Sequence, residues 1–340
     1  MNGLKFIVGL ADGKDNLTDC IEKNKDHISE VYFSWGDFAS GRNRLAECEG
    51  RTLWEIQQGQ VRTLEKLSHL GIRFNLLFNA NCYGKSSQSR AFFDKVGNTA
   101  DYIINNFGLS SVTTASPLIA KFFKNNFKDI EIRASVNMEV GTTVGMDYIS
   151  DVFDSFYLKR EYNRDLEKLK TARRWCDENG KKLYGLANSG CLNFCSTHTF
   201  HDNLVAHENE ISEMDNAYQF GGQCWDYLGK EDKRSRWLQI TNFISPEDVY
   251  LYEGLFDGLK LATRTNKNPA RVVDAYCSGS YSGIVGQLLE PDHSGLFYPE
   301  VIDNKKIPAD FAQRVLNCNK KCGECGFCVE AQKTATVALK

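Results

Sequence analysis

The sequence lacks several features that would assign a protein to a class at once. No hydrophobic run among its 340 residues is long enough to span a membrane. The formal net charge is only −3, so no general basic field indicates bulk binding to nucleic acid or to an anionic membrane. The chain also contains no nucleophile elbow, no phosphate-binding glycine loop and no HExxH helix. The commonest motifs of serine hydrolases, nucleotide-binding proteins and zinc peptidases are therefore excluded.

The start of the chain, MNGLKFIVGLADGKD, has only a short apolar stretch. This stretch suits a buried strand better than a signal peptide. We therefore expect a cytoplasmic protein. Disulfides are rare in a reducing compartment, so the twelve cysteines are expected to include ligands rather than disulfide partners. Three of them, Cys20, Cys176 and Cys277, have apolar neighbours at helical spacing and are expected in the core.

Short apolar runs alternate with helical patterns along the chain. The apolarity within each run is continuous, which is typical of strands that are covered on both faces in a parallel sheet. Eight such runs predict a closed (β/α)8 TIM-like barrel, an α/β fold, with a doubly wound sheet as the lesser alternative. The predicted strands are Phe6–Leu10, Val31–Trp35, Phe74–Phe78, Val112–Ala115, Ile132–Val136, Phe156–Lys159, Leu183–Ala187 and Leu259–Ala262.

Capping residues mark several of the intervening helices. Thr52 and Glu55 form a capping box. Ser116 precedes a proline that would occupy the first helical position. Asn163 is expected to cap a helix that ends at Gly180. Helices therefore separate the predicted strands as a barrel requires.

The domain organisation follows from this alternation. We expect a TIM-like barrel over residues 1–290 and a cysteine-rich C-terminal extension over residues 291–340. Between the last two strands, residues 189–257 are too many for a simple loop. They are expected to form an excursion above the carboxyl end of the barrel, where barrel enzymes build their sites.

One group of cysteines lies in this excursion. Cys191 and Cys195 directly follow the seventh strand, and Cys224 lies downstream. Three thiolates can hold a 4Fe-4S cluster with one open iron, and a fourth thiolate from Cys48 or Cys82 would close it. A zinc ion that orders the excursion is the alternative.

A second group lies in the tail segment CNKKCGECGFC, with Cys318, Cys322, Cys325 and Cys328. Four thiolates this close together wrap one tetrahedral zinc ion poorly, because structural zinc sites use two separated pairs. The spacing favours an iron–sulfur cluster. Whether the chain holds one cluster or two stays open.

Polar residues follow several predicted strands and are candidates for catalysis. Arg160 can clamp a carboxylate or phosphate, and the adjacent Glu161 can orient water or donate a proton. His198 and His201 lie beside the cysteine pair and are candidate ligands or proton shuttles. A salt-bridged rim and surface histidines are the structural alternatives.

The order of several segments resembles a known family. VYFSWGDFASGR, SVN, YLKRE, CLNFCSTHTFHDN and SPEDVYLYEGLFDGLKLATR occur in succession. Together they resemble the collagenase-like peptidase family U32 over most of residues 4–290, and the tail resembles an extension of some members. The resemblance implies a barrel that binds a 4Fe-4S cluster through Cys191 and Cys195, with Cys224 as a third ligand. The usual wider-spaced arrangement of four cysteines is not reproduced.

The family includes proteins of oxygen-independent hydroxylation, acting on ubiquinone precursors and on tRNA or rRNA bases, besides those named peptidases. The resemblance therefore implies an iron–sulfur enzyme that modifies a small molecule, a peptide or an RNA base, with hydroxylation as the most specific form. A peptidase and a non-catalytic metal-binding partner subunit are the alternatives. Some members act in pairs, which implies a homo- or hetero-oligomer. The electron donor is not indicated.

Overall fold

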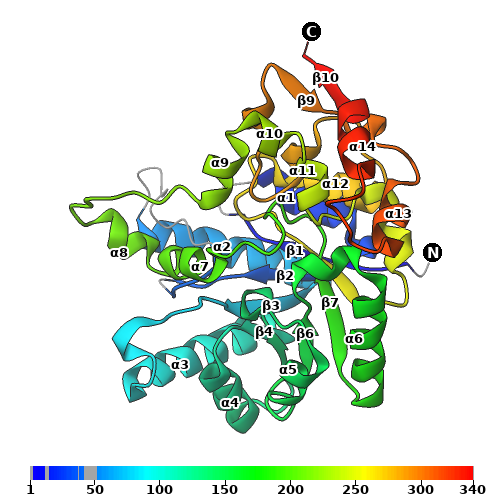
Figure 1. The fold of residues 1–340 in the computed structure, drawn as a ribbon. Helices are drawn as coiled ribbons and strands as arrows, with labels where there is room; N and C mark the ends of the chain where they lie inside the picture. The colour runs from blue at the N-terminus through cyan, green and yellow to red at the C-terminus, as the bar shows by residue number, and fades with distance from the viewer. Residues whose placement is uncertain (1–2, 12–14, 37, 42–51, 340) are drawn as a thin grey trace.

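The eight predicted strands form a closed parallel barrel in chain order, which confirms the predicted fold. The computed structural model describes residues 3–11, 15–36, 38–41 and 52–339. Each strand pairs with its neighbours in sequence, and β8 closes the barrel against β1. Figure 1 shows the strands at the centre of the molecule. They are β1 (Phe6–Gly9), β2 (Ile28–Phe33), β3 (Arg73–Phe78), β4 (Ser111–Thr114), β5 (Glu131–Ala134), β6 (Ser155–Tyr157), β7 (Lys182–Leu186) and β8 (Gly258–Leu261).

Alternate strand residues divide between two cores. The larger core lies between the strands and the surrounding helices. The smaller core fills the inside of the barrel and includes Ile7, Tyr32, Leu77, Tyr157 and Tyr184. Because both faces of every strand are buried, the strand sequences are continuously apolar rather than alternating.

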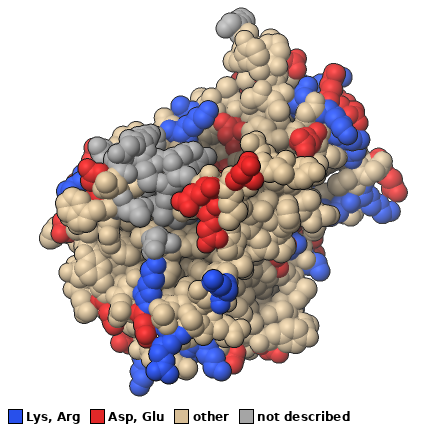
Figure 2. Space-filling model, turned by 90° about the vertical axis from the view of Figure 1, so that its left-hand side faces the viewer, with Lys and Arg blue, Asp and Glu red and all other residues tan. Residues whose placement is uncertain are grey.

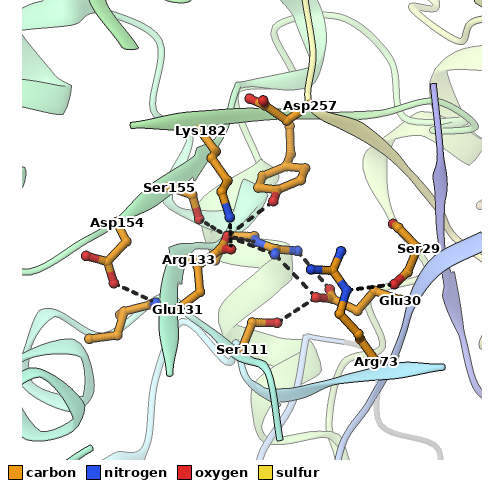
Figure 3. Close-up of polar contacts among 12 residues, drawn as sticks. Ser29, Glu30, Arg73, Ser111, Glu131, Arg133, Asp154, Ser155, Lys182 and Asp257 are labelled. Atoms are coloured by element: carbon orange, nitrogen blue, oxygen red, sulfur yellow. Dashed lines mark hydrogen bonds and ion pairs between the residues drawn. The ribbon is translucent and has the colours of Figure 1, made fainter. Parts of the chain in front are cut away.

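A network of charged residues on the barrel strands is centred on Arg133 (Figure 3). The guanidinium of Arg133 contacts Glu30 at 2.9 Å and Glu131 at 2.9 Å. Ser111 donates to Glu30 at 2.8 Å, and Ser155 donates to Glu131 at 2.7 Å. Buried charges are tolerated when they are paired and hydrogen-bonded in this way.

Helices surround the strands. Thr52 and Glu55 form the predicted capping box, and Ser116 caps the helix that begins at Pro117. Asn163 does not cap the sixth helix: Asp165 does so, accepting from the backbone N–H of Lys168. The barrel helices are α1 (Asp15–Lys23), α2 (Leu53–His69), α3 (Arg90–Phe107), α4 (Pro117–Asn126), α5 (Thr143–Asp147), α6 (Leu166–Glu178) and α12 (Pro269–Ser278).

The correction at Asn163 has a simple cause. The Asn163 side chain is buried and donates to the backbone oxygens of Leu186 and Asn242, at 2.8 and 3.1 Å. Its amide therefore joins β7 to the excursion and leaves capping to Asp165. A local sequence pattern does not reveal these distant acceptors.

The excursion between β7 and β8 is built mainly from short helices. They are α7 (His198–Ala206), α8 (Glu208–Ser212), α9 (Gln223–Leu228), α10 (Glu231–Arg234), α11 (Trp237–Ile240) and the 3-10 helix η6 (Pro246–Tyr252). Figure 1 shows α9, α10 and α11 on one side of the barrel and α3, α4 and α5 on the opposite side.

The C-terminal segment packs on the excursion. It contains β9 (Glu300–Ile302), α13 (Phe311–Asn317), α14 (Phe327–Ala335) and β10 (Thr336–Ala338), and the two strands pair antiparallel. The amide of Gln332 in α14 accepts from Leu238 N at 2.8 Å and donates to Arg234 O at 2.8 Å. Figure 2 shows small groups of both charge signs on one face of the molecule. None of the described helices has both the length and the apolarity required to cross a membrane.

Candidate active site at the barrel mouth

A cleft of about 770 Å³ lies beyond the carboxyl ends of β7 and β8. The excursion forms one wall, and the segments beside α12 form the other. Cys191, Cys195 and Cys224 all line the cleft, together with His198 and His201. The structure therefore brings the first cysteine group and both candidate histidines to one place. Clefts of this size and position are where barrel proteins bind small ligands.

Glycines allow the backbone to place these thiols. Gly190 follows β7, and a Cβ atom at this position would overlap the carbonyl oxygen of Pro291. Gly222 precedes α9 with a φ of 97°, a conformation that residues with side chains rarely adopt. An added Cβ at Gly222 would lie 3.6 Å from Cys224 Sγ and 3.6 Å from His201 Cε1. The two turns thus direct Cys191 and Cys224 into the cleft.

Arg160 reaches the cysteine loop from the neighbouring strand. It begins the 3-10 helix η5 (Arg160–Arg164), directly after β6, and is 5% exposed. Its Nη1 donates to Cys191 Sγ at 3.3 Å. Burial alone would lower the pKa of Arg160, but the nearby Cys191, Asp202 and Glu161 raise it above its ordinary value. Arg160 therefore stays charged beside the sulfur of Cys191.

The carboxylate of Glu161 supports the same loop by binding the loop's backbone. Its Oε1 accepts from Phe194 N at 3.2 Å. Phe194 has a φ of 54°, in the left-handed region, and lies between the two cysteines of the pair. The structure thus places Glu161 where it orients the Cys191–Cys195 loop.

His198 lies between two carboxylates. Its Nδ1 is 2.9 Å from Glu139 Oε1, and its Nε2 is 3.6 Å from Asp202 Oδ2. The contact with His198 lowers the pKa of Glu139, and burial opposes this effect. His201 differs, since its ring packs edge-on against Phe220 with centroids 5.4 Å apart. The buried imidazole of His198 is thus held by acidic groups, whereas His201 packs on an aromatic ring at the cleft.

The three thiols of the cleft influence one another electrostatically. Burial, together with the neighbouring Cys191 and Cys195, raises the pKa of Cys224 to about 11. Their donor chemistry suits a thiolate-bound metal or cluster. Nevertheless, within the described ranges no three His, Cys, Asp or Glu side chains converge closely enough to hold a metal ion. The chain thus presents the donors around one cleft, without coordination geometry.

The tail cysteines form a separate group. Cys318, Cys322 and Cys325 are exposed and Cys328 is partly buried; none of the four lines the cleft. Burial raises the pKa of Cys328, Arg164 opposes that rise, and the other three tail thiols add to it. The other three tail thiols thus act electrostatically on Cys328.

The two candidates for a fourth ligand have different outcomes. Cys48 lies outside the described residues. Cys82 does not line the cleft, and its thiol hydrogen-bonds the imidazole of His207 instead. His207 Nδ1 is 2.9 Å from Glu210 Oε2, and Gly84 N donates to Cys82 Sγ at 3.4 Å. The resulting Cys82–His207–Glu210 chain joins residues that no local pattern in the sequence connects.

A smaller cavity of about 60 Å³ lies inside the mouth of the barrel. Arg160, Lys260 and Arg264 line it, and so do Asp202 and Glu290. Glu290 also lines the cleft, so the two spaces adjoin. Lys260 is a site residue that no motif in the sequence indicated, although a lysine within the apolar run Gly258–Leu261 is the signal that could have found it.

Known proteins resemble this chain in sequence and in fold. No family model matches the chain. The chain is 25% identical over 338 residues to a protein of Methanocaldococcus jannaschii named uncharacterized protease MJ1657, covering 98% of this chain and 95% of that protein. The solved structure of the U32 peptidase Mk0906 has a TM-score of 0.55 and 13% identity, covering 76% of this chain and 93% of that one. A glycoside hydrolase family 5 mannosidase from Rhizomucor miehei has a TM-score of 0.43 and 8% identity, covering 82% and 92%.

The fold and the cleft define a TIM-barrel protein with thiols at the carboxyl end of its strands. Among such proteins, the chain is similar in sequence to a protein named a protease and in fold to a U32 peptidase, in agreement with the resemblance seen in the sequence.

Proposed function

We propose that the chain is a U32-type enzyme whose reaction takes place in the cleft, and that Cys191, Cys195 and Cys224 bind an iron–sulfur cluster there. The observation that carries the proposal is the presence of these three thiols in one cleft, with Arg160 donating to Cys191 Sγ at 3.3 Å. A 4Fe-4S cluster with an open iron would supply electron transfer or a coordination site for substrate. Binding would require the sulfurs to move together from the described arrangement. Zinc is the alternative metal.

The remaining groups have roles that do not depend on the metal. Arg160 keeps a positive charge beside the thiols and can orient an anionic group. His198, held by Glu139 and Asp202, is positioned to store or transfer a proton at the cleft. His201 lies beside Cys224. Glu161 holds the cysteine loop.

The size of the cleft supports the proposed classes of substrate. A space of about 770 Å³ accommodates a small molecule, a short peptide segment or one RNA base. Oxygen-independent hydroxylation is the most specific form of the proposal. It would require an external electron donor, and a partner subunit in a homo- or hetero-oligomer is one source of it. A cytoplasmic, reducing location would keep the thiols available as ligands.

Anaerobic purification followed by iron and sulfide analysis tests the cluster directly. We expect about four irons and four sulfides for each cluster held, as 4Fe-4S stoichiometry requires. A Cys191→Ala variant should lose the cleft cluster. A Cys277→Ala variant is the matched control, since Cys277 lies outside the cleft and beside α1. A preparation with stoichiometric zinc and no sulfide would show that the cluster proposal is wrong.

Peptide hydrolysis is the second candidate, favoured by one specific arrangement. The arrangement consists of a candidate nucleophile, a base and an orienting carboxylate, each in contact with the next: Cys82, His207 and Glu210. A relative named a protease is consistent with this candidate. Release of fragments from a peptide library that is lost in Cys82→Ala, and kept in Cys277→Ala, would support it. Retention of cleavage in Cys82→Ala would reject these three residues as its catalytic group.

A non-catalytic metal-binding subunit is the remaining alternative. A stable complex with a partner protein, together with an unchanged function after substitution of Arg160, would favour it over both enzymes.

A further inference from the structure

The inner cavity of the barrel has the dimensions of a single functional group. Its volume of about 60 Å³ is about twice the volume that one water molecule takes in the liquid. It adjoins the larger cleft at Glu290, which lines both spaces. A ligand in the cleft could therefore extend one end group into the barrel.

Lys260 is the buried cation at this cavity. It lies on β8, is 6% exposed and lines the cavity wall. Its Nζ lies 4.0 Å from the ring centre of Tyr32 and 5.3 Å from that of Tyr157. Aromatic faces attract the ammonium, but they accept no conventional hydrogen bond. Among the described residues, no oxygen or nitrogen acceptor is hydrogen-bonded to this amine, and no carboxylate pairs with it.

The charged groups around Lys260 come from several elements. Burial, followed by the positive charges of Arg264 and Arg133, lowers the pKa of Lys260 to about 7. Glu30 and Glu290 oppose this effect and do not outweigh it. Tyr32 and Tyr157 face the amine as neutral rings, since burial raises the pKa of both phenols.

The carboxylates near the cavity already have other partners. Glu30 pairs with Arg133 at 2.9 Å. Glu290 Oε1 accepts from Thr265 N at 3.0 Å. Asp202 lies 3.6 Å from His198 Nε2. These groups therefore do not supply the direct acceptor that a protonated Lys260 lacks, and an anionic ligand could supply it.

We propose that the inner cavity is the subsite for a carboxylate group of the substrate, and that Lys260 takes up a proton from solvent when this carboxylate binds. The ammonium then pairs with the ligand, and Arg160 and Arg264 at the cavity wall add positive potential. No covalent bond forms or breaks in this step. The inference rests on the proposed function only in placing the rest of the substrate in the cleft.

Calorimetry with simple ligands tests the subsite without turnover. N-acetylglycine, its neutral amide and inorganic phosphate would each be titrated into the purified protein at pH 8, in buffers of different ionisation enthalpy. We expect the acid to bind at least tenfold more tightly than the amide, with uptake of close to one proton. Below pH 6 the uptake should fall towards zero, because Lys260 is then already protonated.

A matched pair of variants locates the effect. Lys260→Met should weaken binding of the acid at least tenfold and abolish the proton uptake. Lys170→Met, at an exposed position on α6, should change neither. Thermal unfolding would check that Lys260→Met is folded. If it is not, the acid–amide difference and the proton uptake of the unsubstituted protein decide the question by themselves.

The outcomes separate this inference from the cluster proposal. Equal affinity for acid and amide, tighter binding of phosphate than of the acid, absence of proton uptake at pH 8, or unchanged binding in a folded Lys260→Met variant would each overturn the subsite. A protein without iron that still binds the acid with proton uptake would reject the cluster and keep the subsite.

Discussion

The guanidinium of Arg160 donates a hydrogen bond to the sulfur of Cys191 at 3.3 Å, joining the end of β6 to the loop after β7. This contact brings a buried positive charge to the thiols of the cleft. Arg160 and Cys191 follow two neighbouring strands, β6 and β7. Adjacent parallel strands place the residues that follow them at the same end of a barrel.

Replacement of Arg160 by methionine should destabilise the fold. The side chain is buried among Cys191, Asp202, Glu161 and Glu139, and its removal takes a positive charge away from these three carboxylates. Removal of one charged partner from a buried ionic group lowers the free energy of unfolding by about 3 kcal/mol. Denaturant unfolding would measure the loss. Arg174→Met, at an exposed position on α6, is the control and should change stability by less than about 0.5 kcal/mol.

The barrel interior should lose stability in acid because of Glu131. Burial alone would raise the pKa of this carboxyl, but Arg133, Lys182 and Ser155 outweigh it and lower the pKa to about 2. Since the pKa in the folded state is below the unfolded value, the stabilisation is complete above about pH 4.5. It is lost as the pH falls towards 2, because the unfolded chain then binds the proton more readily.

At about 1.4 kcal/mol per pKa unit, this contribution amounts to about 3 kcal/mol. Denaturant unfolding between pH 6 and pH 2 would measure it. A Glu131→Gln variant should show a shallower dependence of stability on pH in this range. An unchanged slope in that variant would contradict the assignment to Glu131.

Cys82 should react with alkylating reagents faster at neutral pH than an isolated thiol does. The hydrogen bond with His207, followed by that with Gly84 N, lowers the pKa of Cys82 below its ordinary value, and the thiolate is the reactive form. His207→Ala should slow modification at Cys82 several-fold at pH 7. Mass spectrometry at the level of peptides would follow Cys82 separately from the exposed tail cysteines.

The control for this experiment is His69→Ala, at an exposed position on α2. Its rate of Cys82 modification should match that of the unsubstituted protein. Equal rates in all three proteins would mean that His207 does not activate the thiol.

If each cysteine group holds a 4Fe-4S cluster, a variant without the tail thiols should contain about half as much iron after anaerobic preparation. This variant carries serine in place of Cys318, Cys322, Cys325 and Cys328. Electron paramagnetic resonance would show which signal remains. Truncation before Cys318 is less suitable, since it would delete α14 and the two hydrogen bonds of Gln332 with the excursion. Iron content that does not change in the serine variant would exclude the tail as a ligand set.

The barrel could be predicted because its signals are local. Each strand is a short, continuously apolar run, and each prediction overlaps an observed strand in the same order. The capping box at Thr52 and the cap at Ser116 are likewise local patterns of a few residues. Local patterns were misleading at Asn163, whose acceptors are contributed by Leu186 and Asn242.

The candidate site was predicted only in part. Cys191, Cys195 and Cys224 could be grouped because short spacing and a shared excursion suggested a common location, and they do line one cleft. Their role as cluster ligands stays a prediction. The pairing of Cys82 with His207 depends on how the excursion folds back over the loop after β3, which spacing along the chain does not encode.

The sequence by itself determined the order of strands and helices, the positions of the thiols after β7 and in the tail, and the family resemblance, because these depend on neighbouring residues. Only the tertiary structure decided which side chains share a space. It placed Arg160 against Cys191, placed Lys260 beside two tyrosine rings, and joined Cys82 to His207. Such contacts depend on the closure of the barrel and the packing of the excursion, which bring together groups from distant parts of the chain.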